Sequence, residues 1–254
     1  MSEIPFNRLY GLILVILVGV IIAGCVKNTH FAPVINGWLQ PNAKKGFYRV
    51  KEGDTIYSIA LAFGLDYRAL AAVNHLRVPY TIGSGDLLHM TNVPYGQKIT
   101  LTKLVQESDQ PLPLKQPKPM NPAKSRRSLF HWQWPAKGRI IGPYSATAPM
   151  AGDNRGLGLD ITGDYGEPIH ATFEGVVVYS GAGVRGYGNL IILKHNEDYL
   201  SAYAFNKRIL VKKGNKVRTG QKIAEMGRTD SGCVMLHFEI RRNGKPVNPL
   251  CYLS

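Results

Sequence analysis

A short C-terminal segment carries a histidine on one face of a predicted strand. In residues 235–240 apolar side chains occupy every second position, which predicts a β-strand. Successive side chains of a strand point to opposite faces, so Met235, His237 and Glu239 share one face while Leu236 and the other apolar residues face the core. An imidazole on such a face can bind zinc, but a catalytic zinc site needs three protein ligands and an open position for water.

Two cysteines, Cys233 and Cys251, are further candidates for chemistry. Neither lies in a CxxC or Cys/His spacing, so the sequence does not indicate a metal site built on them. If the chain is exported, the two thiols meet oxidising conditions, in which a disulfide can form. Their spacing leaves open whether they pair.

The elements that must position these residues are short. From about residue 129 to residue 254, β-rich runs alternate with Gly and Pro, as at residues 175–179 and 190–194. Runs of this length and spacing, with few helical stretches, predict a mostly antiparallel sheet or sandwich of about 120 residues.

The N-terminal residues 1–24 have the features of an export signal. Arg8 precedes an apolar run from residue 9 to residue 22. This run is shorter than the ~20 residues that span a bilayer but suits the core of a signal peptide. The following Ile22-Ala23-Gly24-Cys25 resembles the bacterial lipoprotein box, which implies lipidation of Cys25. Val26 then implies transport to the outer membrane, facing the periplasm of a Gram-negative cell. The alternative is a short membrane anchor with an incidental cysteine.

The chain of 254 residues has a formal net charge of +14 and a pI near 9.7, which favours polyanionic partners. No helix-turn-helix, zinc-finger or aromatic-plus-basic signature accompanies this charge. Together with the export signal, this argues against nucleic acid and for acidic wall polymers or lipid headgroups. Residues 25–45 are polar and predict a lipidated tether.

Residues 46–91 predict a compact β-α-α-β module. A strand around residues 48–50 is followed by a turn, and Asp54 is placed to cap a helix from residue 55 to residue 63. Gly64 stops this helix, and Asp66 can cap a second one that ends near Asn74. A closing strand follows at residues 87–90.

A linker is predicted at residues 92–128, where Pro, Gln and Lys dominate. Its start is open by about ten residues, because Gly96-Gln97-Lys98-Ile99 also resembles the last turn of the preceding module.

The segments VKEGDTIYSIA and GDLLHM make the N-terminal module closely resemble a LysM domain. The resemblance implies binding to the N-acetylglucosamine backbone of peptidoglycan, in a groove between the first turn and the loop before the last strand. The residues that it implies for glycan binding are Gly53, Asp54, Thr55, Ile56, Pro79, Tyr80 and Ile82. The alternative is that Ile56 and Ile82 are core residues.

The C-terminal segments WPAKGRIIGPY, GLGLDITGDYGEPIHATFEGVVVYSGA, GNLIILKHN and LHFEIRRNGKPVNPLCYL resemble the lysostaphin-like (LytM-type) zinc endopeptidase domain. With the LysM resemblance, this implies an α+β multidomain chain: a small β-α-α-β module and a mostly antiparallel β domain of the duplicated hybrid motif.

The catalytic positions of that family are only partly kept. Active members carry HxxxD, a histidine after the central strand, and HxH. Asp160 and His237 occupy two of the implied zinc-ligand positions, but Gly156 replaces the first ligand histidine. Phe205 and Met235 stand where the catalytic histidines belong, and neither side chain can move a proton. The resemblance therefore implies no catalytic residues and no zinc cofactor, and another histidine outside the motifs is not expected to rebuild the site.

The order of lipoprotein box, LysM module, linker and degenerate domain closely resembles the NlpD-type murein hydrolase activators. That family implies partners in peptidoglycan, the outer membrane and a periplasmic N-acetylmuramoyl-L-alanine amidase, activated for splitting of the septal wall. By motif position the implied partner groove contains Arg155, Gly156, Asp160, Phe205, Met235 and His237. Two alternatives remain, a weak zinc endopeptidase that uses Asp160 and His237, and a purely structural tether between wall and outer membrane.

Overall fold

The computed structural model describes residues 43–44, 46–90, 132–145 and 156–254, which all lie in one compact unit of residues 31–254. The predicted signal peptide, Cys25, the linker and Arg155 lie outside the described residues. Among the described helices none is long and apolar enough by itself to cross a membrane.

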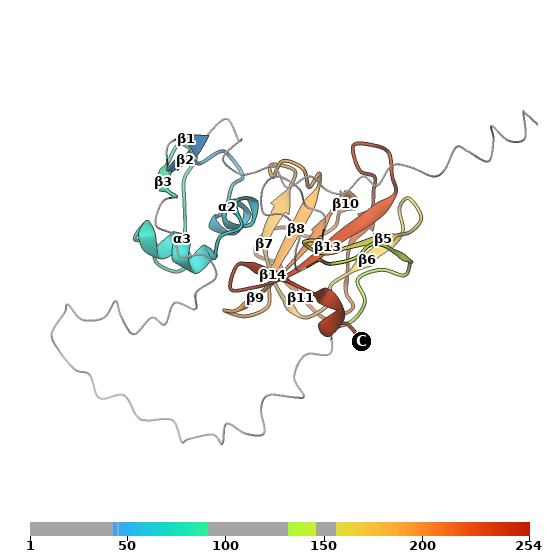
Figure 1. The fold of residues 1–254 in the computed structure, drawn as a ribbon. Coiled ribbons are helices and arrows are strands. Elements are labelled where there is room, and N and C mark those ends of the chain that lie inside the picture. The colour runs from blue at the N-terminus through green and yellow to red at the C-terminus, as the bar shows by residue number, and fades with distance from the viewer. Residues whose placement is uncertain (1–42, 45, 91–131, 146–155) are drawn as a thin grey trace, which may run out of the picture. The chain divides into compact units, whose positions relative to one another are not determined.

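The N-terminal module, residues 43–44 and 46–90, has the predicted β-α-α-β order, but a further short strand precedes it at residues 43–44, inside the predicted tether of residues 25–45. Its sheet has the order β1-β2-β3, formed by β1 (Ala43–Lys44), β2 (Phe47–Arg49) and β3 (Leu87–His89). The helices α2 (Ile56–Phe63) and α3 (Tyr67–Val73) lie between β2 and β3 in the sequence (Figure 1).

The cap of α2 differs from the prediction by one residue. Thr55, not Asp54, is the N-cap, because its side chain accepts from Ser58 N while the Ser58 side chain accepts from Thr55 N. The Asp54 carboxylate instead closes the preceding turn, where it accepts from the Tyr48 hydroxyl at 2.8 Å and from Lys51 N at 2.9 Å. Gly64 ends α2 in the left-handed conformation.

The start of α3 follows the prediction. Asp66 is its N-cap and accepts from Arg68 N, and Asn74 is its C-cap.

The C-terminal domain is built on a large antiparallel sheet. In spatial order its strands are β11 (Lys216–Val217), β7 (Gly175–Gly181), β8 (Leu190–Lys194), β9 (Tyr199–Ala204), β13 (Met235–Arg242), β5 (Leu159–Thr162) and β4 (Ile140–Gly142), and β14 (Lys245–Val247) also pairs with β13. A short 3-10 helix, Pro249–Cys251, follows β14.

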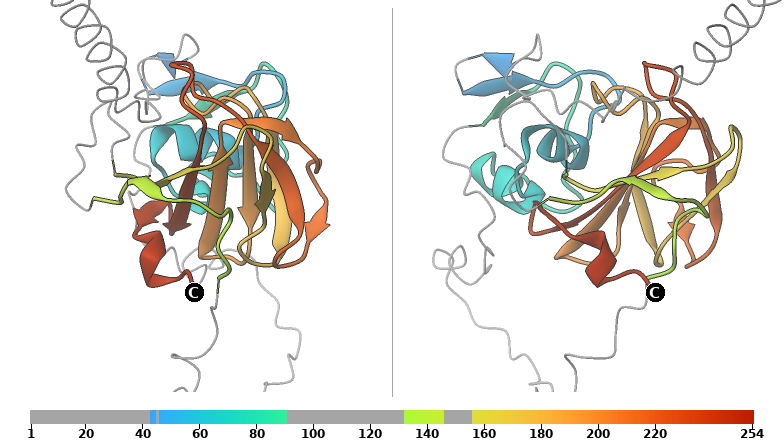
Figure 2. Two further views of the ribbon diagram at one scale, coloured as in Figure 1. Left: turned by 90° about the vertical axis from the view of Figure 1, so that its right-hand side faces the viewer. Right: turned by 45° about the vertical axis from the view of Figure 1, so that its right-hand side comes forward.

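A smaller sheet packs on one side of the large sheet. Its strands β10 (Asn206–Ile209), β12 (Lys222–Met226) and β6 (Pro168–His170) are antiparallel (Figure 2). The core between the two sheets contains Ile169, Ile223 and Met226 from the small sheet and Leu236, Phe238 and Ile240 from β13. The alternation predicted for β13 is therefore present, with its apolar residues in this core.

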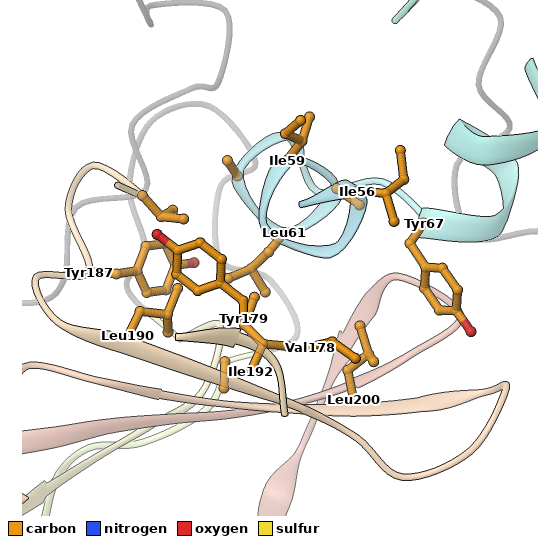
Figure 3. Close-up of a cluster of buried hydrophobic side chains, with 14 of the residues drawn as sticks. Ile56, Ile59, Leu61, Tyr67, Val178, Tyr179, Tyr187, Leu190, Ile192 and Leu200 are labelled. Atoms are coloured by element: carbon orange, nitrogen blue, oxygen red, sulfur yellow. The ribbon is translucent and has the colours of Figure 1, made fainter. Parts of the chain in front are cut away.

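The opposite side of the large sheet packs against the N-terminal module. We call it the module-facing side; it is formed by Val178, Tyr179, Leu190, Ile192, Leu200, Ala202, Ala204 and Met235. Helix α2 contacts β7, and Leu61 projects from α2 toward Tyr179 and the strands beneath it (Figure 3). Since Met235 belongs to this side, His237, Glu239 and Arg241 belong to it by alternation along β13.

Candidate functional site

The two remnant ligand positions lie side by side on adjacent strands. His237 of β13 is the register partner of Asp160 of β5. Nδ1 of His237 lies 2.6 Å from Asp160 Oδ1, and Nε2 lies 3.0 Å from Glu239 Oε1. Both ring nitrogens of His237 therefore face carboxylate oxygens of the protein.

The contacts continue from Glu239 into a wider buried network. The Tyr187 hydroxyl donates to Glu239 Oε1 over 2.9 Å, and Nε of Arg241 donates to Glu239 Oε2 over 2.7 Å. Asp160, His237, Glu239 and Arg241 are all buried. We call these four residues and Tyr187 the His237 network.

The charges of this network balance. Burial opposes the charged form of His237, but hydrogen bonds and charges of Asp160 and Glu239 outweigh it and raise the pKa of His237 to about 10. Burial likewise opposes the charged form of Glu239, whereas Arg241 and His237 lower the pKa of Glu239 to about 2. Two cations thus face two carboxylates in the interior, an arrangement that leaves no buried charge without a partner.

A catalytic zinc ion does not fit these residues. The network commits both nitrogens of His237 to carboxylates, and a zinc site needs three protein ligands. At Gly156, which has φ +88°, an added Cβ would lie 2.6 Å from Ser145 Cβ and 2.7 Å from Ser145 N. A side chain at this ligand position therefore has no room. Within the part of the chain that the structure describes, no group of three His, Cys, Asp or Glu residues could hold a metal ion.

The other candidate groove residues are close to the network and buried. Met235 is 1% exposed and Phe205 is 4% exposed, and both belong to the cluster beneath the N-terminal module. Phe205 has φ 61°, and its amide donates to the Tyr187 carbonyl. The structure therefore brings the His237 network together with Phe205 and Met235, and all of these residues are buried. Their role in binding a partner stays a prediction.

The candidate glycan residues of the N-terminal module are divided between surface and interior. Gly53 and Pro79 are exposed and Asp54 is partly buried, whereas Thr55 and Ile56 are buried, Ile56 to 1%. Ile56 is thus a core residue, as the alternative interpretation held.

Tyr80 and Ile82 are half-buried. The ring of Tyr80 lies 6.5 Å from that of Tyr57 and 5.9 Å from that of Tyr67. Tyr57 and Tyr80 are both partly accessible, and such an aromatic group is a suitable surface for a sugar face. Glycan binding by these residues remains a prediction.

Sequence reasoning found part of the network. Arg241 lies two residues beyond Glu239, so the same alternation could have added it to the face of His237. Tyr187 lies in a loop 52 positions before Glu239 and carries no local signal of this contact. The cysteines left open by the sequence are both free thiols, Cys233 partly buried and Cys251 exposed.

Comparisons with known proteins match both parts of the chain. The LysM domain family matches residues 48–91, and peptidase family M23 matches residues 154–249. The lipoprotein NlpD/LppB homolog of Pseudomonas aeruginosa is 38% identical over 284 residues, covering 98% of this chain and 94% of that protein. The uncharacterized lipoprotein YgeR of Escherichia coli is 37% identical over 252 residues, covering 96% and 92%.

The murein hydrolase activator NlpD of Escherichia coli is 37% identical over 260 residues, covering 81% of this chain and 67% of that protein. With both domain families present and this identity over most of its length, the chain belongs to the NlpD-type family of lipoproteins that combine a LysM domain with a lysostaphin-like M23 domain.

Proposed function

We propose that this chain is a non-catalytic lipoprotein of the Gram-negative envelope that binds peptidoglycan and activates a periplasmic N-acetylmuramoyl-L-alanine amidase. The LysM match supports the glycan contact, and the relatives named murein hydrolase activators support the regulatory role. Lipidation of Cys25 and an outer-membrane anchor facing the periplasm are part of the same proposal, supported by the relatives named lipoproteins.

One observation carries the non-catalytic part of this proposal. The pair His237 and Asp160, which would supply ligands in an active relative, is tied into the His237 network with Glu239. A zinc-bound water also needs a base within hydrogen-bond reach, and the family positions for it are Phe205 and Met235, which cannot accept a proton. Binding is the function that such a surface can still perform.

A dye-release assay on labelled peptidoglycan tests the proposal. Each periplasmic amidase of the producing bacterium is assayed alone, with the full chain, and with the chain lacking residues 130–254. We expect one or more amidases to release dye faster only with the full chain. Equal release in all three conditions for every amidase contradicts amidase activation.

The same assay without amidase decides between this role and a weak endopeptidase. Release of cross-link fragments by the chain and zinc alone contradicts the non-catalytic assignment. The purely structural tether is tested in cells, because a tether keeps its phenotype when residues 130–254 are deleted, whereas an activator loses cell separation.

A further inference from the structure

The surface that carries the candidate partner residues is already occupied by the chain's own N-terminal module. Residues of α2 and α3, including Leu61 and Tyr67, share one buried cluster with Tyr179 and Ile192 of the C-terminal domain (Figure 3). Met235 belongs to the same cluster. These sheet residues are between 0% and 3% exposed. A partner cannot contact Met235 while the module stays in this position.

Polar contacts align the module at one end of this side. The Tyr67 hydroxyl donates to Glu197 Oε2 over 3.1 Å. Arg68 donates from Nη1 to Asp198 Oδ1 over 3.1 Å and from Nη2 to Asn243 Oδ1 over 2.6 Å. Glu197 and Asp198 lie in the turn between β8 and β9, and Asn243 lies in the turn between β13 and β14. The module therefore forms hydrogen bonds with two adjacent turns of the large sheet.

The His237 network itself reaches the module. Nη1 of Arg241 points to the carbonyl oxygen of Leu61 in α2 at 3.4 Å, while its Nε binds Glu239. The Leu61 oxygen also accepts from the capping amide of Gly64 at 3.2 Å, and a guanidinium near the carbonyl end of a helix is a favourable second donor. The side chain of Arg241 thus links the His237 network to α2.

One glycine shows how closely the backbones approach. An added Cβ at Gly244 would lie 2.5 Å from Asp66 N and 2.7 Å from Asp66 Cα. Gly244 has φ +76°, so asparagine, which tolerates the left-handed region, can replace it with little backbone strain. Its side chain would still collide with the module. Docking therefore depends on the absence of a side chain at Gly244.

From these contacts we infer that the N-terminal module is an intramolecular cover of the module-facing side, and that a protein partner reaches this side only when the module leaves. The identity of that partner rests on the proposed function, whereas the position of the module on this side does not. A tethered domain competes at an effective concentration on the order of millimolar. The apparent affinity for the partner falls in proportion to the uncovered fraction of the chain.

The reaction rate of a thiol introduced on the module-facing side measures how often the module leaves that side, and this measurement needs no partner protein. Ala202 is 2% exposed on the module-facing side, so Ala202→Cys in a full chain with Cys25→Ser, Cys233→Ser and Cys251→Ser provides the single site for a thiol reagent. Gly244→Asn opens the cover by collision. Asp198→Arg opens it independently, because it places a cation against Arg68. Gly214→Asn is the matched control, since Gly214 has φ +90° and nothing within 4 Å of an added Cβ.

We expect labelling of the thiol introduced by Ala202→Cys to be slow in the parent and in Gly214→Asn, and faster by on the order of tenfold in both opening variants. The amidase concentration-response in the dye-release assay should shift by a similar factor to lower chain concentration. Fast labelling in the parent, or equally slow labelling in both opening variants, overturns the cover. If the opening variants label faster but the response of an amidase that the parent activates does not change, the cover does not control partner access. If no amidase responds even to the opened chain, the proposed function fails while the labelling still decides the cover.

Discussion

The imidazole of His237 lies 2.6 Å from the carboxylate of Asp160, at the place where both side chains would hold zinc in an active relative. In this chain the second imidazole nitrogen faces Glu239 at 3.0 Å, so a cationic ring occupies the space between two carboxylates. The contact between Asp160 and His237 thus joins β5 and β13 through a buried ionic hydrogen bond.

Removal of Arg241 should destabilise the fold strongly. Arg241→Ala leaves Glu239 buried with one cation fewer, and breaking a buried charge pair costs about 3–5 kcal/mol. Urea denaturation of the full chain measures this change as a fall in the free energy of unfolding. Arg242→Ala is the control, because its side chain is exposed and should cost about 1 kcal/mol or less. Similar costs for the two variants would show that the network contributes little.

Restoring the first ligand histidine should not restore zinc binding. Gly156→His places a side chain against Ser145 and forces an L residue to φ +88°, so we expect lower stability and no tighter zinc binding by titration calorimetry. Gly232→His is matched, since Gly232 has φ +86° but open space around an added Cβ. The variant at residue 156 should lose about 1–3 kcal/mol more than this control. Submicromolar zinc affinity in Gly156→His is the result that contradicts the prediction.

The local elements could be read from the sequence because short-range rules fix them. Gly64 and Asp66 end and begin helices through backbone conformation and capping, and both act as predicted. The cap of α2 differs from the prediction by one residue because Asp54 and Thr55 are both good caps; the reciprocal bonds of Thr55 with Ser58 favour Thr55, while Asp54 binds Tyr48 and Lys51 N.

The candidate site was only partly predictable. Asp160 and His237 were identified by resemblance, and their contact follows from strand pairing that the motifs imply. The burial of Met235 could not be foreseen, since Met235 belongs to one buried cluster with residues of the N-terminal module, which is distant in the sequence. Alternation predicts a face of a strand but not what covers that face.

Acid should destabilise the C-terminal domain through His195. Burial among aromatic rings lowers the pKa of His195 from 6.5 to about 4, although its contact with the Glu174 carbonyl oxygen opposes this. Between these two values the unfolded chain binds a proton that the folded chain does not, so stability falls as the pH drops from 6.5 toward 4 and rises again with pH. The total loss is about 3 kcal/mol.

The measurement is the free energy of unfolding at several pH values between 4 and 7. His195→Gln should flatten this part of the profile, whereas His75→Gln, at an exposed position, should leave the slope unchanged. An unchanged slope in His195→Gln would assign the acid sensitivity to other groups.

Tyr80 should contribute to glycan binding from the rim of its aromatic group. Tyr80 is half-buried and keeps part of its ring accessible beside Tyr57 and Tyr67, so Tyr80→Ala removes a stacking surface for a sugar and leaves the core of the module in place. We expect about tenfold weaker co-sedimentation with insoluble peptidoglycan, which corresponds to a contact worth about 1.4 kcal/mol. Tyr165→Ala is the control, because Tyr165 is an exposed tyrosine of the C-terminal domain, between Lys207 and Arg228. Equal loss in the two variants would point to a general effect of charge and aromatic surface, whereas loss confined to Tyr80→Ala places the sugar at the loop before β3.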